Sequence, residues 1–230
     1  METTNKKARI YNVIILDKSG SMSSIAQQAI DGVNETLGAI SSSQLRDPEQ
    51  DNLVTLVAFC GCETRMICEN QPIADVQNIT ERDYRPCCMT PLYDAVGTTV
   101  TRLRKATEGE KCAVAVTIIT DGYENASKEF TGQAVKKLID DCRNQGWMFA
   151  YIGADHDVEA VATQLSIHNA MRFNKSAAGT RKMFARERSA KMGWMNKMAC
   201  MLRDDTISDE DRNMAMKKES DSYFDDEEAK

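Results

Sequence analysis

Short runs of apolar residues alternate with helix-like patterns along most of the chain. Residues 10–16 (IYNVIIL) and 112–120 (CAVAVTIIT) are continuous apolar runs of strand length, which is typical of strands buried on both faces of a sheet. Residues 147–152 predict another strand. Residues 53–60 and 64–68 predict a pair of strands around a short connection.

Amphipathic helices are predicted between these strands, because apolar residues recur there at steps of three and four. They are expected over residues 25–40, 92–103, 130–142 and 158–165. We expect Pro91 as the first residue of the second helix, Gly146 just past the third, and Asp155 as the cap of the fourth. Residues 171–173 predict a last edge strand.

The alternation of strands and helices predicts an α/β fold with a mostly parallel central sheet, helices on both faces and one antiparallel edge strand. We expect this domain over residues 8–175. Residues 176–203 predict a basic, Met-rich helical extension, which we expect to pack on the parent domain. Residues 204–230 are rich in charge and poor in apolar side chains, which predicts a frayed or disordered tail.

Charge changes sharply along the chain. The formal net charge of −6 belongs entirely to residues 203–230, which hold 11 acidic and 5 basic residues. The segment 175–203 holds eight basic residues and one acidic residue, Glu187. The negative total argues against a generic binder of polyanions, and no apolar stretch is long enough to cross a membrane. The polar residues 1–9 show no secretory signal, so we expect a cytoplasmic protein.

Oxygen-bearing side chains follow two of the buried strands. The first strand ends in Asp17-Lys18-Ser19-Gly20-Ser21, whose carboxylate and hydroxyls can converge on one point. The strand at 112–120 ends in Thr120-Asp121-Gly122. Because ligands of open α/β sheets bind outside the carboxyl ends of the strands, both aspartates are predicted at one edge. Such hard oxygen ligands suit Mg²⁺.

A third segment, Met89-Thr90-Pro91-Leu92-Tyr93-Asp94-Ala95, leads into a helix and leaves the Thr90 hydroxyl at its mouth. Together the three segments resemble the von Willebrand factor A (vWA) family, whose metal-ion-dependent adhesion site is D-x-S-x-S, then a threonine, then an aspartate. The matching positions are Asp17, Ser19, Ser21, Thr90 and Asp121. The resemblance covers about residues 8–175. Cys87-Cys88-Met89 stands where the family often has glycine.

The resemblance implies a Rossmann-like fold and a Mg²⁺ site, which Mn²⁺ or Ca²⁺ can also fill. Three hydroxyls and two carboxylates leave the ion able to take an Asp or Glu carboxylate from a protein partner as its last ligand. This implies metal-bridged protein binding without turnover. The short chain resembles stand-alone bacterial or phage members, which implies partners such as AAA+ ATPases or stress- and tellurite-resistance assemblies. The acidic run 225–228 is a further candidate ligand for the same metal.

Two other functions stay open. Mg²⁺ beside Asp17 could serve a phosphate-ester hydrolase. However, Ser19 stands where dehalogenase-like phosphatases need a second aspartate, so we expect no enzyme. The basic residues between Arg181 and Lys197 could bind nucleic acid, although a solvated helix face is the commoner outcome. His156 is expected as a polar rim residue. Glu124 and Asn125 are expected either to tune the metal face or to cap the next helix.

Eight cysteines without a secretory signal indicate reduced thiols. Five of them fall close enough in sequence to suggest zinc, namely Cys60, Cys62, Cys68, Cys87 and Cys88. Their spacing matches no paired C-x2-C arrangement. We therefore expect ordinary free thiols, with a structural zinc ion as the alternative.

Overall fold

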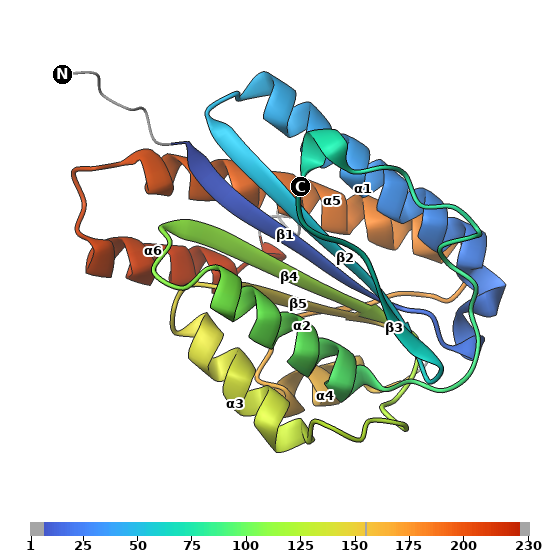
Figure 1. The fold of residues 1–230 in the computed structure, drawn as a ribbon. Helices are drawn as coiled ribbons and strands as arrows, with labels where there is room; N and C mark the ends of the chain where they lie inside the picture. Colours follow the sequence, from blue (N-terminus) through green and yellow to red (C-terminus); the bar gives the residue numbers. More distant parts are fainter. Residues whose placement is uncertain (1–6, 155, 226–230) are drawn as a thin grey trace.

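The computed structural model describes residues 7–154 and 156–225, which form a six-stranded sheet between two layers of helices (Figure 1). The strands are β1 (Ala8–Asp17), β2 (Gln50–Cys60), β3 (Glu63–Pro72), β4 (Cys112–Thr120), β5 (Met148–Gly153) and β6 (Asn169–Arg172). Their order is β3-β2-β1-β4-β5-β6, and only the β2–β3 pair is antiparallel. The predicted fold class is confirmed.

The helices divide between the two faces of the sheet. They are α1 (Ala26–Arg46), α2 (Leu92–Ala106), α3 (Gly132–Arg143), α4 (Val158–Gln164), α5 (Ala177–Arg203) and α6 (Asp209–Asp221). Helices α1 and α5 cover one face, and α2, α3 and α4 cover the other (Figure 1). Alternate residues of β1 enter the two cores: Ile14 packs in the α1–α5 layer and Ile15 in the α2–α3 layer.

Helix boundaries depart from the sequence predictions at two caps. Pro91 is the residue before α2 rather than its first residue. The side chain of Asp157 accepts a hydrogen bond from the Ala160 amide and caps α4. The predicted cap, Asp155, lies outside the described residues. Gly146 follows α3 with φ +87, a left-handed conformation that favours glycine, as expected for a helix end.

The helical extension belongs to the same core as the sheet. The Phe184 ring lies so close to Gly32 of α1 that a Cβ there would come within 2.2 Å of it, so glycine permits this helix contact. Met195 and Met198 of α5 are fully buried against the sheet. The expected packing of this helix on the parent domain is confirmed. None of the described helices is both long and apolar enough to cross a bilayer.

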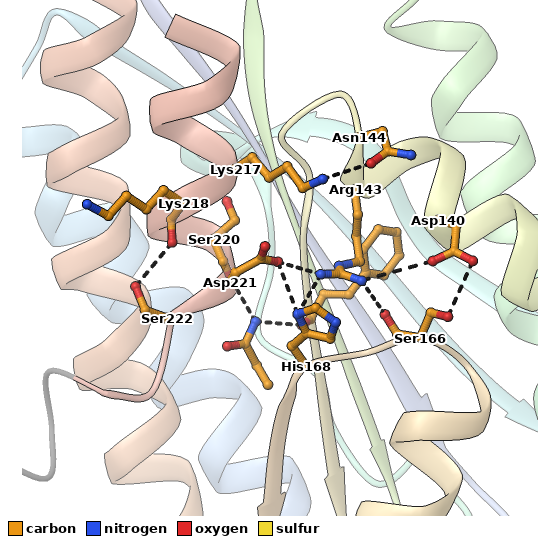
Figure 2. Close-up of polar contacts among 12 residues, drawn as sticks. Asp140, Arg143, Asn144, Ser166, His168, Lys217, Lys218, Ser220, Asp221 and Ser222 are labelled. Carbon is orange, nitrogen blue, oxygen red and sulfur yellow. Dashed lines mark hydrogen bonds and ion pairs between the residues drawn. The ribbon is translucent and has the colours of Figure 1, made fainter. Parts of the chain in front are cut away.

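Residues 209–224 differ from the predicted frayed tail. They include helix α6, and the two aromatic residues that follow it, Tyr223 and Phe224, are buried. Polar contacts hold this helix against α3. The Arg143 Nη2 atom lies 2.6 Å from the Asp221 Oδ1 atom, and Arg143 Nη1 donates to the Ser166 carbonyl (Figure 2). The sequence did not predict this helix because it has no apolar stripe of its own. Contacts with residues far away in the chain hold it against the rest of the protein.

Candidate metal centre

The predicted site residues meet at the carboxyl ends of β1 and β4, the two central strands of the sheet. The strand order reverses between these two strands, which is where ligands of open α/β sheets bind. Asp17 is the last residue of β1. The backbone amide of the next residue, Lys18, donates a hydrogen bond to the Phe59 carbonyl of β2. The chain then turns into a short 3-10 helix, Gly20–Ile25. This turn brings the Ser19 and Ser21 hydroxyls back beside the strand end, 3.0 Å apart.

Asp17 is fully buried and both of its carboxylate oxygens accept hydrogen bonds. The Ser19 amide donates to Oδ1 at 2.6 Å, and the Thr120 hydroxyl donates to Oδ2 at 2.6 Å. Burial raises the pKa of the Asp17 carboxyl to about 6, against these two hydrogen bonds, which lower it. The nearby charge of Asp121 raises it further. A cation at this place would therefore relieve an unfavourable concentration of negative charge.

Asp121 presents one oxygen to a hydroxyl and the other to a cation. The Ser21 hydroxyl donates to Oδ1 at 2.5 Å. The Lys175 ammonium lies 2.6 Å from Oδ2, and the side chain of Asp121 is completely buried. Among the described residues, Oδ2 accepts no hydrogen bond of good geometry, so the contact with Lys175 is an ion pair only. The Lys175 ammonium is thus the counter-ion of this carboxylate.

Thr90 lies on the same side of the site. A Cβ on Gly122 would meet the Thr90 hydroxyl at 3.6 Å and the Ser21 hydroxyl at 3.8 Å, so the two hydroxyls flank one point. Asn125 holds the Thr90 backbone from both sides: its side chain accepts from the Thr90 amide, and its own amide donates to the Thr90 carbonyl. The threonine is 3 % exposed and fixed in place.

The donor set of the site is entirely oxygen, which fits Mg²⁺. Three hydroxyls and two carboxylates come from three separate segments, and their arrangement already accommodates an ammonium group. Mg²⁺ is bound in proteins through one or two carboxylates with further oxygen ligands from water or substrate. The residues present are therefore compatible with the ion that the sequence predicts.

The chain was compared with known proteins by sequence and by structure. No family model and no curated protein matches it by sequence. Among solved structures, a von Willebrand factor type A protein from Catenulispora acidiphila matches with a TM-score of 0.60 at 14% identity, over 81% of this chain and 43% of that one. The vWF domain of the type V pili tip protein Mfa5 from Porphyromonas gingivalis matches with a TM-score of 0.56 at 11% identity, over 81% and 96%.

A third match is the ArnB paralog VWA2 from Sulfolobus acidocaldarius, with a TM-score of 0.52 at 12% identity. It covers 79% of this chain and 46% of that one. The chain has the vWA fold. It spans less than half the length of the Catenulispora and Sulfolobus chains, and these similarities concern the fold alone.

Within this vWA fold, several polar residues near the site have structural partners. Glu124 accepts from the Tyr93 amide and so caps α2, the helix before it rather than the one after it. His156 is buried, not on the rim, and its ring nitrogens contact the Tyr151 hydroxyl at 2.9 Å and the Ala154 carbonyl at 2.5 Å. These side chains shape the edge of the vWA sheet and do not point to a ligand.

Three residues at the site escaped the sequence analysis: Thr120, Lys175 and Tyr84. Thr120 was visible in the Thr120-Asp121-Gly122 segment, where its position beside Asp121 was the available signal. Tyr84 donates a hydrogen bond of 2.6 Å to the Asp17 carbonyl, and its pKa is raised well above the ordinary value by burial. Nothing in the sequence marks Lys175 or Tyr84, because each reaches the site from a segment that carries no motif.

Proposed function

We propose that this vWA domain is a Mg²⁺-dependent protein-interaction module that captures an Asp or Glu carboxylate of a partner. The metal would be held by Asp17, Ser19, Ser21, Thr90 and Asp121. The observation that carries the proposal is the buried Asp121 carboxylate, which lies against two hydroxyl-bearing segments and already faces a cation, Lys175. When bound, Mg²⁺ would supply the positive charge that attracts an outside carboxylate.

The residues of this chain have distinct tasks in that arrangement. Asp17 and Asp121 provide negative charge, and the hydroxyls orient neutral oxygens toward the same point. Thr120 and the Ser19 amide hold the Asp17 carboxylate in one orientation. Such second contacts position ligands and tune their affinity for the metal.

The surface beside the site supports a protein partner. Met89 is 57% exposed and immediately precedes Thr90, and Tyr123 is 55% exposed two residues after Asp121. Met and Tyr are enriched in protein interfaces, where they contribute apolar contact around polar anchors. A charged centre with such neighbours suits a partner that offers one carboxylate and an apolar surface around it.

Binding without turnover agrees with the residues at the site. Ser19 stands where a phosphatase of the dehalogenase type would need its acid. The basic segment 175–203 has few unengaged charges to offer a nucleic acid, because six of its eight basic residues contact other side chains: Lys175, Arg186, Arg188, Lys191, Lys197 and Arg203. A partner among AAA+ ATPases or stress- and tellurite-resistance assemblies stays a prediction from the resemblance.

The first experiment measures Mg²⁺ binding by titration calorimetry and by the rise in melting temperature. Asp17→Asn keeps the shape of the side chain and removes its charge, so we expect loss of Mg²⁺ binding in a folded protein. Asp157→Asn is the matched control, because it removes an exposed carboxylate near the same edge and asparagine is also a good helix cap.

The second experiment selects partners from a displayed peptide library in Mg²⁺ buffer. We expect binders that contain an essential Asp or Glu and that dissociate when the metal is chelated. Replacing that residue by Asn or Gln should abolish binding. Peptides that bind equally well in excess chelator, or to Asp17→Asn, would contradict metal-bridged capture.

A further inference from the structure

Four cysteines gather at one end of the sheet, beside the oxygen site but separate from it. Cys60 and Cys62 flank the turn between β2 and β3, and Cys87 and Cys88 lie in the loop that leads to Thr90. The Sγ atoms of Cys60, Cys62 and Cys87 all lie within 4.8 Å of one another, and those of Cys60 and Cys87 are 3.4 Å apart. Cys88 lies beside the same turn, because a Cβ on Gly61 would come within 3.5 Å of the Cys88 Cβ.

We propose that Cys60, Cys62, Cys87 and Cys88 form a tetrahedral Zn²⁺ site that holds the Thr90 loop against the β2–β3 turn. Four thiolates around zinc, with Zn–S bonds of about 2.3 Å, place their sulfur atoms about 3.8 Å apart. The sulfur atoms of Cys60, Cys62 and Cys87 lie near that separation, within 4.8 Å of one another, whereas the Cys88 thiol has to rotate toward them to complete the set. Soft thiolate ligands select zinc over Mg²⁺, so the two sites would take different ions.

The backbone explains how an unusual spacing can make such a site. Side chains of successive residues in an extended chain point to opposite sides. Cys88 has φ +63, a conformation that is rare for a residue other than glycine, and this breaks the alternation at the Cys87–Cys88 pair. Both residues therefore lie beside the turn that carries Cys60 and Cys62. The fifth cysteine of the sequence group, Cys68, is not part of the cluster and instead contacts the Val54 carbonyl.

Hydrogen bonds already fix the loop on both sides of the thiols. The Cys87 amide donates to the Lys18 carbonyl, and the Gly20 amide donates to the Cys88 carbonyl. On the other side, the Gly61 amide donates to the Met89 carbonyl at 2.7 Å. A preorganised backbone of this kind lowers the entropy cost of gathering the ligands. The cluster thus connects the segment of Asp17 to Ser21, the turn at Gly61 and the loop before Thr90.

The test is metal analysis of the full chain purified under reducing conditions without chelator. We expect about one zinc ion per chain. Reconstitution with Co²⁺ should give a sulfur-to-cobalt charge-transfer band and the visible spectrum of a tetrahedral ion. The band requires thiolate ligands, so it also separates this site from the oxygen site: it should persist in Asp17→Asn, whether or not that variant binds Mg²⁺.

Two variants avoid a failure to fold. Cys62→Ser changes an exposed residue in a turn, and Cys88→Gly places glycine where the backbone favours it. We expect both to lose the cobalt band and the tightly bound zinc. Cys200→Ser is the control, because it removes an exposed cysteine outside the cluster and should leave both unchanged.

Four results would overturn the proposal. The first is a reduced wild-type chain that binds neither Zn²⁺ nor Co²⁺. The second is a cobalt band that survives in Cys62→Ser and Cys88→Gly. The third is iron in place of zinc in the purified protein. The fourth is a Cys60–Cys87 disulfide that forms in the purified chain in preference to metal binding, which would make these thiols a redox pair.

Discussion

Two buried carboxylates of this protein each pair with a lysine, and the two pairs differ in what else surrounds them. Glu187 of α5 lies 3.1 Å from Lys191 and also accepts hydrogen bonds from Thr117 and Tyr223. Both members of the Glu187–Lys191 pair are at most 2% exposed. All three contacts come from protein groups, and all reach the same oxygen, Oε1.

Asp121 has fewer contacts, one at each oxygen. One of its oxygens has the Ser21 hydroxyl, and the other has only the ion pair with Lys175, whose side chain is 17% exposed. The first pair therefore links α5 and Tyr223 to β4, whereas the second lies at the candidate metal centre with a lysine that is partly exposed. A buried carboxylate beside a lysine thus occurs in two settings, one inside the core and one at the candidate metal centre.

The largest expected effect comes from breaking the buried Glu187–Lys191 pair. Lys191→Met leaves the Glu187 charge buried without its cation, so we expect a loss of about 3–5 kcal/mol in the free energy of unfolding, measured with denaturant. Adding Glu187→Leu removes the charge as well and should restore most of this loss. A double variant as unstable as the single one would mean that Lys191 stabilises the fold through packing alone.

Thr120→Val tests the support of the second carboxylate. It removes the hydrogen bond to Asp17 Oδ2 and should cost about 1–3 kcal/mol of stability, because a buried oxygen loses its donor. We also expect weaker Mg²⁺ binding in calorimetry. Thr120→Ser keeps the hydroxyl and is the control. Equal Mg²⁺ affinity in both variants would show that Asp17 needs no such support.

Lys175→Met sharpens the comparison most directly. Removing the ammonium beside Asp121 should raise the affinity for Mg²⁺ by about tenfold or more, since like charges a few ångströms apart repel by several kcal/mol near a protein surface. Lys175→Arg keeps the charge and should bind Mg²⁺ much as the wild type does. An unchanged or lower affinity in Lys175→Met would exclude competition between the lysine and the metal.

The smallest expected effect concerns the acidic end of the chain. The predicted internal ligand, residues 225–228, lies outside the described residues except for Asp225. Deletion from residue 204 is an unsuitable test because Met216, Tyr223 and Phe224 belong to the core. Removing residues 226–230 alone should leave stability unchanged and modestly increase capture of a carboxylate peptide. No change in capture would exclude the run as a competitor.

The fold class and the edge of the sheet that holds the candidate site could be predicted from the sequence, because the signals for both lie within single elements. Strand runs such as residues 112–120 and the helix spacing after Pro91 are periodic within one element. The rule that ligands gather at the carboxyl ends of parallel strands then placed Asp17 and Asp121 together, and the structure brings them to one edge. Helix α6 was missed because its partners lie far away in the chain, whereas the Asp157 cap of α4 has a local partner, Ala160, and was misassigned by two residues.

The amino-acid sequence by itself determined the alternation of strands and helices, the α/β class and the order of the five oxygen-bearing positions. Only the tertiary structure decided that Lys175 pairs with Asp121 and that Glu187 contacts Lys191, Thr117 and Tyr223. The tertiary structure also places the turn after Cys60 next to the loop that holds Cys87. The physical reason is that periodicity is a property of neighbouring residues, whereas charge pairing and thiol clustering depend on which distant segments the packed sheet brings together.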